Sequence, residues 1–146
     1  MSKEELVIDN ILQSVPGCIY WKDVNGVYLG CNQKEAETLG FKYPKGVVGT
    51  TDYDLSWNCE ADVLRKTAER VMHNRVSEEV LEKVTSSNDE KILALTRKSP
   101  LYDGKDNVVG VIGVSIDITD RKKREEAKTK LKIREGLRKI AKEKEE

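Results

Sequence analysis

Two strand–turn–strand patterns, one on each side of a helical segment, constrain the fold of this chain more than any other feature. The first joins residues 19–22 to 27–31 through Asn25-Gly26, a pair that tolerates the positive φ of a tight hairpin turn. The second joins residues 92–101 to 108–118 through a polar loop with Gly and Asn as turn residues. The sequence therefore predicts two β-hairpins.

Helical patterns surround the hairpins. Apolar residues recur at helical spacing over 3–15, and Pro16-Gly17 ends the pattern. Asn32 is predicted to cap a short helix, with Glu35 as its capping-box partner and Gly40 as its terminator. Residues 59–73 carry the most regular apolar stripe, whereas 41–58 predict irregular backbone and 76–84 fit neither period. This order predicts an α+β domain, a five-stranded antiparallel sheet with helices on one face.

Two glycines, Gly110 and Gly113, interrupt the Val/Ile run of the last predicted strand. Interior glycine marks either a bulge or the close approach of another group, and the sequence leaves both open.

Charge divides the chain at Thr119. The part up to Thr119 has 14 basic and 19 acidic residues, and the part after it has 12 basic and 7 acidic residues. Acidic residues interleave the basic tail, which has no aromatic residue to stack on bases, so we expect no nucleic-acid binding. Ile133, Leu137 and Ile140 have the spacing of a coiled-coil seam, but a short and weak one.

Several classes of protein are excluded by what the sequence lacks. No apolar run is long enough to span a membrane, and the first residues do not resemble a signal peptide, so we expect a cytoplasmic chain without membrane contact. Cys18, Cys31 and Cys59 are widely spaced and have one histidine to join them, which predicts reduced thiols and no metal site. No phosphate-binding loop or catalytic constellation is present, and we expect no enzymatic activity.

The chain resembles the PAS sensory domain over roughly residues 8–122. The resemblance rests on ILQSVPG (11–17) and YWKDVNGVYLGCN (20–32), VGTTDYDL (48–55), KSPLYD (98–103), VGVIGVS (109–115) and DITDRK (117–122), in that order and spacing. It implies a flanking N-terminal helix (1–15), a PAS domain (16–119) and a charged C-terminal signalling helix (120–146). The first hairpin is most similar to PAS input domains of bacterial sensor histidine kinases.

The resemblance implies that the domain senses a signal, a small ligand or a partner, and relays it through its C-terminal helix to a covalently linked output domain. That output domain would be a two-component histidine kinase. The family and the amphipathic N-terminal helix also imply a homodimer. The alternative function is a dimerisation and protein-interaction module that binds no ligand.

Haem and flavin do not fit the sequence. His73 is the one imidazole, and it lies at the end of its predicted helix, whereas haem-binding relatives carry the ligand within that helix. Asn58-Cys59 echoes the start of the reactive-cysteine motif of flavin-binding relatives, but the Arg and the aromatic residue are missing. We therefore expect neither cofactor.

A ligand pocket between sheet and helices is the typical site of the family. The candidate lining residues are Tyr53, Trp57, Met72, Leu93, Leu95, Val109 and Val111. The same residues would equally fill a closed core, and periodicity does not distinguish a pocket from a core. Tyr20 and Trp21 must point to opposite faces of their strand, which predicts that one is buried and the other available for dimer contacts.

The junction between the last strand and the tail is the candidate signal-relay site, formed by Asp117, Ile118, Thr119 and Arg121. A carboxylate and a hydroxyl placed where a strand becomes a helix can cap the first helical turn. Asp117 can also pair with a nearby cation such as Arg121 or Lys122. We expect strain in the sheet to pass through Asp117 to the helix.

Overall fold

The computed structural model describes residues 1–145, and the side chains of residues 121–124, 127 and 145 lie outside that description. The helices are α1 (Lys3–Ser14), α2 (Gln33–Thr38), α3 (Ala61–Asn74) and α4 (Thr119–Glu145), and the strands are β1 (Cys18–Asp23), β2 (Tyr28–Cys31), β3 (Glu78–Thr85), β4 (Lys91–Tyr102) and β5 (Val108–Asp117). Three 3₁₀ turns, η1 (Pro44–Gly46), η2 (Asp52–Asp54) and η3 (Asn58–Glu60), occupy the irregular segment between α2 and α3.

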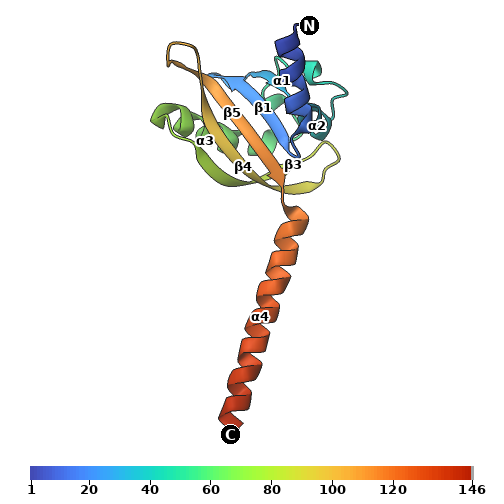
Figure 1. Ribbon diagram of the computed structural model, residues 1–146, viewed down its shortest axis with the longest axis vertical. Helices are drawn as coiled ribbons and strands as arrows, with labels where there is room; N and C mark the ends of the chain where they lie inside the picture. Colours follow the sequence, from blue (N-terminus) through green and yellow to red (C-terminus); the bar gives the residue numbers. More distant parts are fainter. Residues whose placement is uncertain (146) are drawn as a thin grey trace.

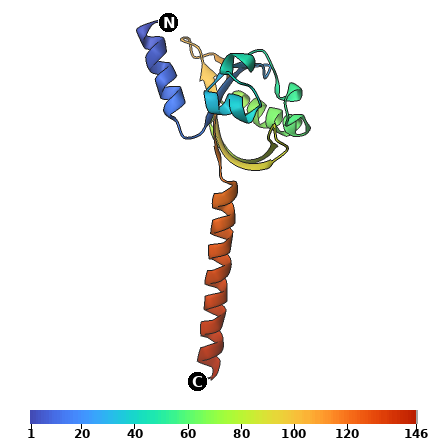
Figure 2. The same ribbon diagram turned by 90° about the vertical axis from the view of Figure 1, so that its right-hand side faces the viewer.

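The five strands form one antiparallel sheet in the order β2-β1-β5-β4-β3. Helices α2 and α3 and the 3₁₀ turns cover one face of the curved sheet, and α1 lies outside this layer at the N-terminus (Figure 2). The end of α1 contacts the start of α2, where the Gln33 amide donates to Oε1 of Gln13 at 3.0 Å. Helix α4 continues from β5 and extends away from the domain (Figure 1). The predicted α+β fold class and five-stranded sheet are confirmed.

Strand β3 is the element for which the sequence pattern was ambiguous. It pairs with β4 along its whole length, with Val80 opposite Thr96 and Val84 opposite Ile92. The pattern resists prediction because a charged residue, Glu82, takes an inward position between Val80 and Val84. A partner on β4 balances this buried charge, which no local periodicity reveals.

The two interior glycines of β5 are sites of close approach. A Cβ on Gly113 would collide with the ring of Tyr20, and a Cβ on Gly110 would collide with the backbone carbonyl of Lys22. Tyr20 is buried against the covered face of the sheet, whereas Trp21 is half-buried on the other face. The Tyr20 ring thus fills the space that Gly113 leaves, and β1 and β5 pack tightly because both positions lack a side chain.

Gly113→Ala is therefore expected to destabilise the domain by about 1–3 kcal/mol, the usual cost of overpacking a filled site. Urea denaturation followed by tryptophan fluorescence measures this difference in unfolding free energy. Gly104→Ala is the matched control, because no atom lies within 4 Å of the Cβ that it adds. Equal stability of the two variants would contradict the packing described for Tyr20.

Helix α4 carries no buried side chain among those described. Its apolar residues Leu131, Ile133, Leu137 and Ile140 are each at least half exposed. These four side chains are thus available to a partner. No helix within the described range is both long enough and apolar enough to cross a membrane.

Candidate ligand-binding cavity

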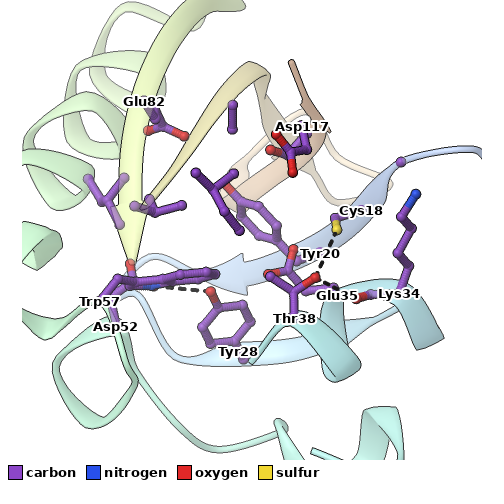
Figure 3. Close-up of a pocket in the computed structure, with 16 residues that line it drawn as sticks. Cys18, Tyr20, Tyr28, Lys34, Glu35, Thr38, Asp52, Trp57, Glu82 and Asp117 are labelled. Carbon is purple, nitrogen blue, oxygen red and sulfur yellow. Dashed lines mark hydrogen bonds between the residues drawn. The ribbon is translucent and has the colours of Figure 1, made fainter. Parts of the chain in front are cut away.

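A cavity of about 130 Å³ lies between the covered face of the sheet and helices α2 and α3 (Figure 3). Aromatic rings and charged groups line it together. The lining residues are Gly17, Cys18, Tyr20, Tyr28, Lys34, Glu35, Thr38, Asp52, Trp57, Leu64, Glu82, Val84, Ile92, Ala94, Ser115 and Asp117.

Asp52 organises the polar end of the cavity. Its Oδ2 lies 2.6 Å from Nζ of Lys22, and its Oδ1 accepts hydrogen bonds from the hydroxyl of Tyr28 (3.0 Å) and Nε1 of Trp57 (2.8 Å). Burial by itself raises the pKa of Asp52, but the Lys22 ammonium and these hydrogen bonds outweigh burial and hold the pKa below its ordinary value. Asp52 is therefore a carboxylate at neutral pH.

The Lys22 side chain is buried beside two aromatic rings. Its ammonium lies 4.9 Å from the ring centroid of Tyr20 and 4.5 Å from that of Tyr28. Burial lowers the pKa of Lys22, while the charge and hydrogen bond of Asp52 oppose this effect. A second buried pair joins Lys98, which is 2% exposed, to Glu82 at 2.8 Å. The covered face of the sheet thus carries two compensated ion pairs.

Glu35 reaches the cavity from helix α2. Oδ1 of Asn32 accepts a hydrogen bond from the Glu35 amide at 3.1 Å, so the predicted N-cap is present. The reciprocal half of the predicted capping box is wrong, because the Asn32 amide donates to the carbonyl of Ile19 instead. The Glu35 carboxyl is thereby released from the cap and points into the cavity, where the residue is 2% exposed (Figure 3).

The opposite end of the cavity approaches the start of α4. Asp117, at the end of β5, lines this end and accepts two hydrogen bonds from Thr119, one from the amide (3.0 Å) and one from the hydroxyl (2.6 Å). Oγ1 of Thr119 also accepts a hydrogen bond from the Leu93 amide at 3.0 Å, and the Ile118 amide donates to the Leu93 carbonyl. The junction therefore connects the cavity, strand β4 and the first residue of α4.

The predicted relay residues Asp117, Ile118 and Thr119 are brought together in this junction. The side chain of Arg121 lies outside the described residues, and so does that of Lys122. The predicted ion pair between Asp117 and one of these cations therefore stays a prediction.

Of the seven predicted lining residues, Trp57 lines the cavity and the other six do not. Leu93 and Leu95 lie on the uncovered face of β4, because the register turns Ile92 and Ala94 inward and a shift of one residue reverses the faces of a strand. Val111 is buried in β5 away from the cavity, and Val109 near the start of that strand is exposed.

Tyr53 and Met72 are likewise displaced from the cavity. Tyr53 is 52% exposed, and its hydroxyl donates to Oδ1 of Asp62, because the 3₁₀ turn η2 directs Asp52 inward and its neighbour outward. Met72 is half-buried on α3, where Leu64, Ala68 and Val71 form the buried stripe. The lining of the cavity is consequently more polar than the seven apolar and aromatic candidates predicted.

The two residues that haem or flavin binding would involve, His73 and Cys59, lie outside the cavity. His73 is exposed in the last turn of α3, and Cys59 is exposed in η3. Burial raises the pKa of the Cys18 thiol, which lines the cavity, to about 11, so this thiol is protonated and weakly nucleophilic. Within the described residues no cluster of three or more His, Cys, Asp or Glu side chains has the arrangement of a metal site.

Comparison with solved structures shows the same fold. A dimer of VqmA from Vibrio cholerae, solved without its target DNA, matches with a TM-score of 0.73 and 23% identity over 83% of this chain and 54% of that one. A phage VqmA–DPO complex matches at 0.69 and 26% identity, over 88% and 59% of the two chains. The PAS domain of Bordetella pertussis BvgS matches at 0.66 and 22% identity, over 90% and 98%. The chain spans a little over half the length of the VqmA structures.

No curated protein matched the chain. The family model described as the PAS fold matches residues 12–123, which includes the sheet, the cavity and the junction with α4. The chain belongs to the PAS fold family.

Proposed function

We propose that this chain is a sensory domain that binds a small molecule in the cavity and relays its occupancy through α4 to a linked output domain. The observation that carries the proposal is that one cavity extends from the Asp52–Trp57 cluster to Asp117, the residue that holds Thr119 at the start of α4. A ligand at the Asp117 end of the cavity competes with Thr119 for the Asp117 carboxylate and changes how the helix begins. The chain acts by binding, without catalysis and without haem or flavin.

Asp117→Ala is expected to remove the hydrogen bonds that anchor Thr119. Loss of a helix cap costs about 1 kcal/mol, which corresponds to roughly fivefold faster hydrogen exchange at the junction. Exchange of the Thr119 amide measured by NMR checks this. In addition, a bound ligand should alter exchange along α4 in the wild type and not in the variant.

Asp117→Asn is the conservative control, since its side-chain oxygen still accepts from Thr119. We expect it to retain slow exchange at Thr119. Unchanged exchange and unchanged ligand response in Asp117→Ala would show that the junction is only a passive connection.

The nature of the output domain is part of the proposal. The resemblance of the first hairpin favours a two-component histidine kinase, and a fusion of α4 to a kinase core tests this through ligand-dependent autophosphorylation. The VqmA structures, one solved in complex with ligand and DNA, favour a DNA-binding output instead. In either arrangement the charged helix α4 is the connecting element rather than the nucleic-acid contact.

A ligand-free dimerisation module is the second candidate function. It is favoured by α1, on which Leu6, Val7, Ile8 and Ile11 are each at least half exposed. Apolar side chains in such a row are more stable when a second surface covers them.

Native mass spectrometry with an absorption spectrum separates the two functions. A retained compound on the order of 100 Da per chain is expected from the size of the cavity, since a cavity of about 150 Å³ binds benzene. A tight dimer that retains no compound and gains no thermal stability from a small-molecule library would favour the module. Visible absorption would contradict the proposal that neither haem nor flavin is bound.

A further inference from the structure

Among the described charged side chains that are buried at the cavity, Glu35 is the one without an ion-pair partner. Asp52 is paired with Lys22, and Glu82 is paired with Lys98. Among the described residues no group donates a hydrogen bond to the Glu35 carboxyl, although a buried carboxylate ordinarily has partners. The carboxyl oxygens face the cavity instead, so the place of the missing partner is inside it.

The remaining charges at the cavity do not supply that partner. The Lys34 ammonium is turned to the Pro16 carbonyl, to which it donates at 2.9 Å, and Asp117 is held by Thr119. When the two ion pairs are counted as neutral, the remaining charged lining residues are Lys34, Glu35 and Asp117. Negative charge is therefore in excess at the cavity. A ligand that brings one positive charge complements this balance, whereas an anion adds to the repulsion.

The walls of the cavity also suit a cation. Tyr20, Tyr28 and Trp57 present aromatic rings, and the two tyrosines already hold the Lys22 ammonium near their centroids. Aromatic faces attract cations, most strongly where water is excluded. A volume of about 130 Å³ admits a molecule near the size of benzene.

From these features we infer that the cavity binds a compact organic cation, a small amine or amidine whose N–H groups donate to the Glu35 carboxylate. The inference rests on the proposed sensory function and specifies its ligand. The charged groups that face Glu35 from the elements packed on it are Lys22 of β1, Asp52 of η2 and Glu82 of β3. Because the Glu35 carboxyl has a pKa of about 7, such a ligand displaces a proton when it binds near neutral pH.

Three molecules of nearly equal shape test the charge preference. Benzamidine is a cation, benzamide is neutral and benzoate is an anion, and acetamidine, acetamide and acetate form a smaller series with the same charges. By isothermal titration calorimetry at about pH 8, where Glu35 is ionised, one amidine should bind at least about tenfold more tightly than its amide. The carboxylates should not bind detectably.

Glu35→Gln should abolish the preference for the amidine, because the charge is removed and the shape is kept. Glu37→Gln is the matched control on the same helix, since Glu37 is exposed, and it should keep the preference. In the wild type, amidine affinity should fall as the pH is lowered from about 8 to about 6, while amide affinity stays constant.

The inference is overturned if an amide or a carboxylate binds most tightly, or if Glu35→Gln retains the preference. In both cases the cavity is still a ligand site, and the proposed function stands. Failure of all six molecules to bind at millimolar concentration also overturns the inference, and native mass spectrometry then decides the proposed function independently.

Discussion

Asp52→Asn is expected to lower the free energy of unfolding by about 3–5 kcal/mol, the usual cost of leaving one partner of a buried ion pair uncompensated. The side-chain oxygen of the new residue still accepts from Trp57 and Tyr28, so the loss isolates the 2.6 Å pair with Lys22. Since domains of this kind are stable by about 5–15 kcal/mol, the variant should lie close to its unfolding transition. Urea denaturation at neutral pH measures the loss.

Two variants control for this result. Asp54→Asn changes the exposed carboxylate of the same 3₁₀ turn and should cost less than about 1 kcal/mol. Adding Lys22→Met to Asp52→Asn removes the orphaned ammonium and should recover part of the stability. If Asp52→Asn were as stable as Asp54→Asn, the ion pair would have no structural role.

The local features of the fold could be predicted from the sequence because local chemistry determines them. Asn25-Gly26 marks the position of the first hairpin, although Gly26 alone of this pair has a positive φ, of 84°, and Asn25 does not. Asn32 caps α2 through its own side chain, as the spacing indicated. The apolar stripe of α3 reflects its burial on the sheet, although the helix begins at Ala61 rather than at residue 59.

The cavity could not be predicted in the same way, because its character depends on charged residues that point inward. Lys22 and Asp52 are 30 positions apart, and each is tolerated in the core only because the other is there. Sequence patterns assign such residues to the surface. The same patterns favour the apolar Leu93 and Leu95 as core-facing residues. The register of β4 instead turns the smaller Ala94 and the polar Thr96 inward.

The capping-box pattern predicts two hydrogen bonds between Asn32 and Glu35, and one of the two is present. Its position three residues after Asn32 is that of a capping-box glutamate, and the amide of Glu35 does bond to Asn32. The competing bond from the Asn32 amide to Ile19 of β1 is a tertiary contact. The direction of the Glu35 carboxyl therefore depends on the packing of α2 against β1, which the local spacing does not specify.

Glu35→Gln is expected to change the pH dependence of stability more than any other single substitution of a glutamate. Burial, with opposing attraction from Lys22 and added repulsion from Asp52 and Glu82, raises the pKa of Glu35 from 4.5 to about 7. Between these values the folded chain binds the proton more tightly than the unfolded chain, so the free energy of unfolding decreases as the pH rises. The glutamine variant lacks this loss and should be more stable than the wild type by about 3 kcal/mol above pH 7.

Denaturation of both proteins at a series of pH values tests this expectation, since their difference removes contributions from all other groups. The difference should be near zero at about pH 4, grow through the window between the two pKa values and become constant above it. Glu37→Gln should instead parallel the wild type, because its exposed carboxyl loses little hydration on folding. A difference between the wild type and Glu35→Gln that does not vary with pH would mean that the Glu35 carboxyl is hydrated or paired in the folded protein, and the cavity would then lack the uncompensated acid that distinguishes it.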